Sequence, residues 1–333
     1  MQHDHCCHSN TSEHIAIDKK LKITGGIFIT LFLISLLPAL SNLNESFIYY
    51  LSIIWWAVLL GLVLGGIIDH FVPDGFIFKF LGQRRKRTLI YAVFAGFLLS
   101  ACSHGILALA IQLYKKGASI PAVITFLLAS PWANLPITIL LFGFFGWQAF
   151  LFIFGAMLVA LITGFIFTLL EDRNLIEASN NPANAETYEW EAIKQFNLKH
   201  SMSQVGRSTI SLANMVLWWI LIGFMISVLI KTYVPHEWFM NYFGADFFGL
   251  LMTLLVATVI EICSEGSSPI AFEIFNQVGT LGNPFVFLMA GVVTDYTEIG
   301  LLWSNIGKRT AIYLPVIAVP QVLLLGILFN QII

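Results

Sequence analysis

Long apolar stretches, separated by short polar ones, dominate the chain from residue 23 to its end. They approach or exceed the roughly 20 residues with which a helix spans a bilayer. The apolar residues are continuous, whereas a membrane β-barrel needs alternation over strands of about ten residues. The pattern therefore predicts eight or nine membrane helices. The stretches cover about 23–40, 47–70, 88–113, 120–145, 147–170, 209–230, 246–277, 283–303 and 310–330.

Composition agrees with a membrane protein. Hydrophobic residues make up 58% of the chain and charged residues only 11%, against about 25% charged residues in a soluble domain. Such a chain is neither a cytosolic enzyme, a nucleic-acid binder nor a disordered protein. The first 22 residues are polar and lack a secretory cleavage pattern. The four cysteines, Cys6, Cys7, Cys102 and Cys263, do not form the pattern of a disulfide framework.

The chain contains an internal duplication. Short motifs recur in the same order, and their spacings differ by only one or two residues. Duplicated halves are typical of secondary transporters. The matching motifs are Trp55-Trp56 with Trp218-Trp219, Val72-Pro73 with Val234-Pro235, Cys102-Ser103-His104-Gly105 with Cys263-Ser264-Glu265-Gly266, and Phe126 to Ala129 with Phe287 to Ala290.

These observations predict an all-α polytopic membrane protein with two homologous halves. A weak apolar stripe in the linker leaves open whether that segment is a surface helix or a solvated connection. The predicted parts are a His/Cys-rich cytoplasmic tail (1–22), an extra N-terminal transmembrane helix (23–46), membrane repeat A (47–171), a polar cytoplasmic linker (172–208) and membrane repeat B (209–333).

Each Cys-Ser motif lies inside an apolar stretch and is followed by glycine, as expected of a broken or re-entrant helix. The distribution of basic residues distinguishes the two topologies. With a cytoplasmic N-terminus, full crossings at 88–113 and 246–277 place 11 of the 17 Lys and Arg residues inside. Two re-entrant hairpins place 16 inside and leave only Lys231 outside. We therefore favour re-entrant hairpins in inverted halves, with parallel halves as the alternative.

Polar and ionisable residues at membrane depth are candidates for a substrate path, because burying a charge in lipid costs several kcal/mol. Thiolate and imidazole groups suit copper(I) and zinc, and the carboxylates could neutralise the cation or exchange protons for it. Two pairs of acids share a helical face, at spacings of four and three residues. The candidates are Cys102, Ser103, His104 and Asn134 in the first half, and Glu261, Cys263, Ser264, Glu265, Asp295 and Glu298 in the second.

Structural interpretations of the same residues stay open. A buried cysteine often acts as a small hydrophobic residue, and His104 could hydrogen-bond a carbonyl. Glu261 or Glu298 could pair helices. Glu273 is expected near an interface, where its charge costs little.

The N-terminal tail gathers soft and borderline metal ligands. Such tracts bind zinc or copper without a fold, although incidental affinity is the simpler interpretation. We expect no tightly bound cofactor; a copper or zinc ion would be either transported or held by the tail. The tail ligands are His3, His5, Cys6, Cys7, His8 and His14.

The motifs resemble those of the ArsP-type predicted permeases, a family of uncharacterised and heavy-metal efflux proteins. The resemblance covers nearly the whole chain from about residue 48, and the tail is similar to that of the branch of copper and zinc efflux transporters. It implies export across the bacterial inner membrane. Where many relatives have Cys-Ser-Cys-Gly, this chain has His104, so an argument from paired thiols is weaker. The matching stretches are Cys102 to Gly105, Leu113 to Ser119, Phe126 to Pro131, Glu261 to Gly266 and Phe287 to Glu298.

The leading hypothesis is a secondary transporter that exports copper or zinc, and an efflux permease for trivalent or organic arsenicals is the alternative. The phosphate-loop pattern Gly-x-x-x-x-Gly-Lys-Ser/Thr is absent, so we expect proton antiport through the buried acids. The patterns His-Glu-x-x-His and Gly-x-Ser-x-Gly are absent too, which disfavours an intramembrane enzyme. The duplicated segments disfavour a metal sensor without transport. The expected partners are the heavy-metal ion and the bilayer, without nucleic acid; a homo-oligomer is compatible with the sequence.

Overall fold

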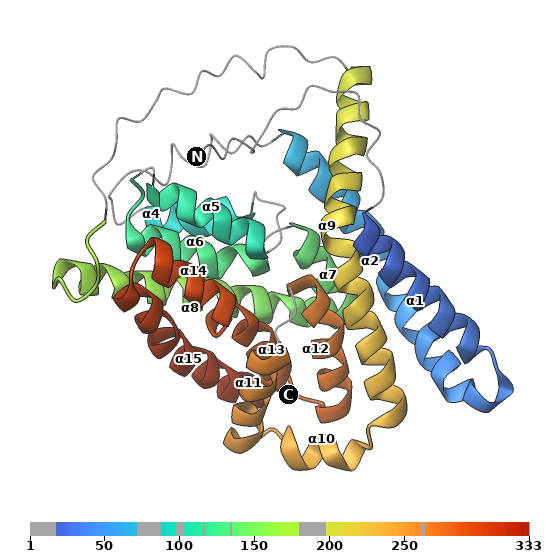
Figure 1. Cartoon of the computed structure of the whole chain (residues 1–333). Coiled ribbons are helices and arrows are strands. Elements are labelled where there is room, and N and C mark those ends of the chain that lie inside the picture. The colour runs from blue at the N-terminus through green and yellow to red at the C-terminus, as the bar shows by residue number, and fades with distance from the viewer. Residues whose placement is uncertain are drawn as a thin grey trace.

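The protein is a bundle of helices (Figure 1). The computed structural model describes residues 18–71, 88–97, 103–115, 117–133, 135–179, 198–260 and 264–332, and no strand occurs within these ranges. The helices in chain order are α1 (Lys19–Ser35), η1 (Pro38–Leu40), α2 (Ser41–Phe71), α4 (Thr88–Phe97), α5 (Ser103–Lys115), α6 (Ile120–Ala133), α7 (Leu135–Phe145), η2 (Gly146–Gln148), α8 (Ala149–Asp172), α9 (Leu198–Tyr233), α10 (His236–Tyr242), α11 (Phe247–Ile260), α12 (Ser264–Val278), α13 (Gly282–Val293), α14 (Tyr296–Asn305) and α15 (Lys308–Asn330).

One end of the bundle is fastened by the segment that follows α8. The Glu177 carboxylate accepts hydrogen bonds from the backbone N–H groups of Arg309 and Thr310, each at 2.9 Å, at the start of α15. The Ser179 hydroxyl accepts the N–H of Ile120 at 2.8 Å, at the start of α6. Both contacts satisfy N–H groups that a helix start otherwise leaves unpaired. We call this the linker end.

The opposite end is fastened by two asparagines, and we call it the α10 end. Asn330, at the end of α15, accepts the N–H of Gly282 at 2.7 Å and donates to the Ala245 carbonyl at 2.9 Å. Asn283, in the first turn of α13, donates to the Gly244 carbonyl at 3.2 Å. The end of α15, the start of α13 and the connection from α10 to α11 therefore lie together.

Two pairs of short helices enter the bundle from opposite ends. In the first pair, Leu89 of α4 lies beside Gly164 of α8, and α5 ends at Lys115, close to the start of α6 at the linker end. In the second pair, Gln277 in the last turn of α12 contacts His236 of α10 at 3.1 Å. Helix α11 also begins beside α10. The chain thus enters and leaves α4–α5 at the linker end, and enters and leaves α11–α12 at the α10 end.

The same packing partners recur in the two parts of the chain. Helix α4 packs against α6 and α8, and α11 packs against α13 and α15. Helix α5 contacts α6 and α14, while α12 contacts α13 and α7. The long helices α2 and α9, which carry the two Trp-Trp motifs, pack against each other.

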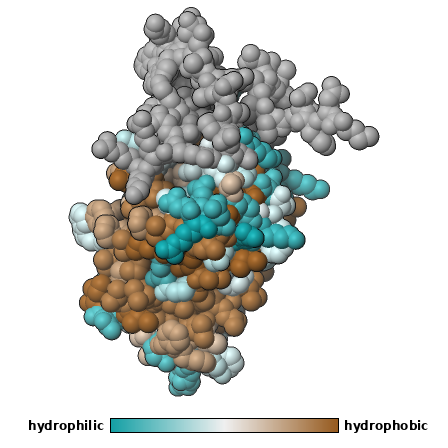
Figure 2. Space-filling model, turned by 90° about the vertical axis from the view of Figure 1, so that its left-hand side faces the viewer, coloured by the Kyte–Doolittle hydropathy of each residue, from teal (hydrophilic) through white to brown (hydrophobic). Residues whose placement is uncertain are grey.

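Among the described residues, five helical segments are long and apolar enough to cross a membrane, or up to six if α10 and α11 form one bent span. Large exposed hydrophobic side chains are found on many of these helices. Figure 2 shows an apolar middle on one face, with hydrophilic residues gathered toward the linker end. The protein is therefore a multi-pass membrane protein, with fewer uninterrupted spans than the eight or nine predicted.

The number falls because several predicted segments consist of two helices. Residues 88–113 contain α4 and α5, and 246–277 contain α11 and α12. Residues Gly282–Asn305 still form one of the five candidate spans, although the Asp295 carboxylate accepts the N–H groups of Thr297 and Glu298 and so begins a second helix, α14, within it. Helix α9 begins at Leu198, inside the predicted linker.

A sharp turn also separates α7 from α8. Together with η2 they form a helical run of 38 residues, which at 1.5 Å per residue is about twice the thickness of a bilayer core. Gly146 adopts a left-handed φ of 55° between them, a conformation that glycine adopts without strain. The following Trp147 is 82% exposed. We therefore assign α7 and α8 to separate passages.

Candidate functional site

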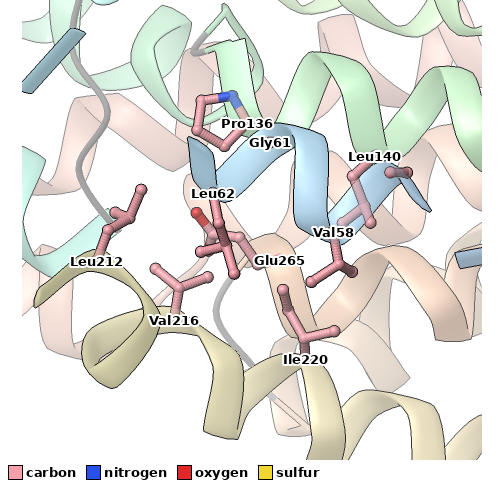
Figure 3. Close-up of a pocket in the computed structure, with 10 residues that line it drawn as sticks. Val58, Gly61, Leu62, Pro136, Leu140, Leu212, Val216, Ile220 and Glu265 are labelled. Atoms are coloured by element: carbon pink, nitrogen blue, oxygen red, sulfur yellow. The ribbon is translucent and has the colours of Figure 1, made fainter. Parts of the chain in front are cut away.

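Among the described residues, Glu265 is the only ionisable side chain that lines an apolar pocket between four helices (Figure 3). It lies in the first turn of α12 and is 4% exposed. The first turn of a helix favours negative charge, because unpaired N–H groups point out of it. The other lining residues are Ala57, Val58, Gly61 and Leu62 of α2, Pro136 and Leu140 of α7, and Leu212, Val216 and Ile220 of α9.

The glycine of the second motif brings α12 against α9. A Cβ atom on Gly223 of α9 would collide with the backbone of Gly266, directly after Glu265. Two glycines therefore allow the backbones to touch, which fixes the depth of Glu265 in the bundle. In the sequence, Gly266 is only one residue of a motif. The packing shows why its partner, Gly223, has no room for a side chain.

Asp295 and Glu298 lie at the start of α14, inside the bundle. Asp295 is buried and caps the helix through N–H contacts at 2.6 and 2.9 Å, so it has a structural role. Glu298, in the first turn, is 1% exposed. Thr294, just before this start, shares a hydrogen bond of 2.7 Å with Thr258 near the end of α11. The break between α13 and α14 thus adjoins the end of α11.

The described part of the first Cys-Ser motif forms the start of α5. Ser103 and His104 are the first two residues of that helix, and α5 packs against α14, which Asp295 caps. The helix of the first motif and the acids of the second half are therefore neighbours.

Several predicted site residues lie outside the described residues. Within the described ranges, no group of three or more His, Cys, Asp or Glu side chains could hold a metal ion. A thiol-containing metal site therefore stays a prediction. The residues outside are Cys102, Asn134, Glu261 and Cys263 of the predicted path, and His3, His5, Cys6, Cys7, His8 and His14 of the tail.

Two buried polar atoms near the helix breaks have no hydrogen-bond partner among the described residues. They are the Ser264 hydroxyl at the start of α12 and the indole N–H of Trp132 near the end of α6. Buried polar groups normally have partners, and exceptions often reflect water, an ion or function. Each of these two groups could therefore form a further hydrogen bond, one at the start of α12 and the other near the end of α6.

The sequence analysis missed a polar cluster around Glu273. This side chain is 1% exposed, whereas we expected it near an interface. Its carboxylate accepts hydrogen bonds from the Tyr50 hydroxyl of α2 and, at 2.7 Å, from the Gln277 amide. The Lys231 ammonium lies 3.2 Å from the ring centroid of Tyr49. The available signal was a carboxylate eight residues after Glu265 and two tyrosines within an apolar stretch.

Comparisons with known proteins agree on one class. A family model described as a predicted permease matches residues 39–331. The chain is 24% identical, over 79% of its length and 87% of the relative, to the "Putative two-component membrane permease complex subunit" of Streptococcus mutans. It is 25% identical to the UPF0718 protein YcgR of Bacillus subtilis, over 80% of the chain and 90% of the relative. No solved structure matches the chain.

Proposed function

Because the chain belongs to the ArsP-type family of predicted permeases, we propose that it exports a soft or borderline heavy-metal ion, copper or zinc, in exchange for protons. Its relatives point to a membrane transporter rather than an enzyme. The direction, out of a bacterial cytoplasm across the inner membrane, follows the resemblance described for the motifs and the tail.

One observation carries this proposal: α12 and α14 both begin inside the bundle, and buried carboxylates lie at their starts. Ionisable groups at membrane depth are expensive and usually belong to ion or proton pathways. Glu265 is the only ionisable group that the described part of the chain contributes to its apolar pocket, and Asp295 and Glu298 lie beside the start of α14. Cys102, His104 and Cys263 would supply the soft ligands next to these acids.

The proposal includes inverted halves, with the linker end in the cytoplasm. The pair α4–α5 enters the bundle from the linker end and the pair α11–α12 enters from the α10 end, which supports this arrangement. Basic residues support it too, because Lys115, Arg173 and Lys308 belong to helix ends at the linker end. Lys231 belongs to the last turn of α9, at the α10 end.

A growth assay tests the transported substrate. The chain is expressed in a metal-sensitive bacterium, and growth is compared on copper, zinc, cadmium and organoarsenicals, with Cys102→Ser and Cys263→Ser tested together. We expect resistance to copper or zinc that the paired substitution removes. The control is Cys6→Ser with Cys7→Ser, which removes the two thiols of the N-terminal tail. Resistance to arsenicals alone would establish the alternative substrate, and resistance untouched by the paired substitution would refute the central site.

The tail is tested separately by removing residues 1–14. We expect slower metal capture at low external metal and unchanged maximal efflux, because the tail precedes the first apolar stretch in the sequence and contains none of the proposed path residues. Complete loss of efflux would place the tail in the path.

Topology is tested by cysteine labelling. A cysteine replacing Lys115 should react with a membrane-impermeant reagent only after the cells are opened, whereas one replacing Glu237 of α10 should react in intact cells. Labelling of the Lys115 position in intact cells would refute the inverted arrangement.

A further inference from the structure

A second buried carboxylate lies on α12, closer to the α10 end than Glu265. Glu273 is two helical turns beyond Glu265, about 12 Å along the axis at 1.5 Å per residue. The pocket that Glu265 lines does not include it. Its hydrogen bond with Tyr50 joins the α11–α12 pair to the long helix α2.

Glu273 is connected to the surface through side chains. Gln277 donates to its carboxylate at 2.7 Å, and the carbonyl oxygen of the same Gln277 side chain lies 3.1 Å from Nδ1 of His236. His236 is exposed at the start of α10. A chain of polar atoms thus runs from the buried carboxylate to the α10 end.

Both charge states of Glu273 have support from their surroundings. The ionised form accepts bonds from a hydroxyl and an amide, and the Lys231 ammonium, on a helix packed against α12, supplies positive charge. The protonated form would carry no net charge in a buried place, where an isolated charge is costly. Helices α7 and α13 contribute no ionisable group. Toward the α10 end, the ionisable side chains on the other surrounding helices are Glu45, Tyr49 and Tyr50 of α2, Lys231 and Tyr233 of α9, and His236, Glu237 and Tyr242 of α10. Farther along, α2 also carries Asp69 and His70, and α9 also carries Lys199, His200 and Arg207.

We propose that Glu273 is a proton-exchange site of this transporter, which takes up and releases a proton at the α10 end and thereby couples metal export to the proton gradient. On protonation one carboxylate oxygen gains the proton that a hydronium ion loses, and the reverse step releases it. Because protonation weakens the bond accepted from Tyr50, proton binding would also loosen α12 from α2. The coupling role rests on the proposed function, whereas the proton exchange itself does not.

Proton exchange is tested without any metal ion. The purified full chain in detergent is titrated from about pH 9 to about pH 3, where an ordinary carboxylate is almost fully protonated, and protons bound per polypeptide are counted. Glu273→Gln should bind one proton fewer than the unchanged chain. Glu237→Gln, which removes an exposed carboxylate at the same end, is the matched control and should also bind one fewer. A Glu273→Gln titration identical to that of the unchanged chain would refute the site.

A second variant keeps the carboxylate, in case Glu273→Gln does not fold. Tyr50→Phe removes one donor to the ionised form, so it should bind the unchanged number of protons but take up one of them at higher pH. A superimposable titration curve would also contradict the inference.

Coupling is tested in proteoliposomes with the metal ion that the growth assay identifies. In Glu273→Gln, the metal flux driven by a pH gradient should fall at least about tenfold. Metal-for-metal exchange without a gradient should persist. Full gradient-driven flux in this variant would refute the coupling role and leave the transporter intact. Absence of any flux in the unchanged chain would refute the proposed function, and the proton count would still decide whether Glu273 exchanges protons.

Discussion

The helices α5 and α12 follow the two Cys-Ser motifs and occupy corresponding places in the packing, yet their chemistry differs. Helix α12 carries two buried carboxylates, Glu265 and Glu273, whereas α5 contains no acidic residue. Besides the partners that correspond to those of α5, α12 also packs against the long helix α9. Buried carboxylates thus lie on α12 and not on α5, and the motif at the start of α5 contains Cys102 and His104.

The largest expected effect tests whether the tight contact of α12 is special. Gly223→Ala should lower the free energy of unfolding by about 3 kcal/mol and reduce the yield of folded protein, because the new methyl group collides with the Gly266 backbone. Gly61 of α2, one position from the residue that the Trp-Trp motifs align with Gly223, faces α7, and a Cβ atom there would lie 3.2 Å from the Pro136 carbonyl oxygen. Gly61→Ala should therefore cost under about 1 kcal/mol. Thermal unfolding in detergent measures both.

Gly206→Ala is the control, because nothing lies within 4 Å of its built Cβ atom. Equal losses for Gly61→Ala and Gly223→Ala would show that the two halves are packed alike, contrary to the comparison.

The next effect concerns the carboxylate that α5 lacks. Glu265→Gln keeps the size of the side chain but removes its charge, so metal efflux should fall at least about tenfold while the folded yield is unchanged. His104→Gln replaces one neutral ligand by another and should reduce efflux less. Efflux of a radioactive metal ion from loaded cells measures both, with Glu237→Gln as the control. If His104→Gln lost more metal efflux than Glu265→Gln, the first half of the chain would contribute more to transport than the second half.

A smaller effect is expected at the fastening of the α10 end. Asn330→Ala leaves the buried N–H of Gly282 without its acceptor, which should cost about 1–3 kcal/mol. Since an amide does not titrate, this loss should be the same at every pH in thermal unfolding experiments. A strongly pH-dependent loss would show that other groups fasten this end.

The smallest effect is expected at the linker end and depends on pH. Burial alone raises the pKa of Glu177, but the bonds from Arg309 and Thr310 outweigh it and hold the pKa below its usual value. This carboxylate therefore stabilises the fold above the unfolded pKa of about 4.3, and the stabilisation is lost as the pH falls through the folded pKa. Glu177→Gln should cost about 1 kcal/mol at neutral pH.

In thermal unfolding experiments, the difference between Glu177→Gln and the unchanged chain should vanish in acid. A difference that persists there would mean that the bonds, rather than the charge, account for the effect.

The sequence predicts the helical class and the buried position of Glu265, because long apolar stretches and charges within them are local signals. It does not predict how segments pair across the bundle. Glu273 looks like an interfacial residue until Tyr50, 223 positions away, is found beside it. Likewise, Asp295 looks like a path residue, and only the helix start reveals that it is a cap. The thiol positions Cys102 and Cys263 stay predictions.

The Glu177 contact has a consequence for biosynthesis. Glu177 leaves the ribosome long before its partner Arg309, because 132 residues separate them. Until α15 is inserted, the Glu177 carboxylate lacks the N–H groups that it binds, although Ser179 can already accept the N–H of Ile120 in α6. This part of the linker end therefore closes only after α15 has been synthesised. A chain that ends before α15 lacks the Glu177 contact even when its first half is in the membrane.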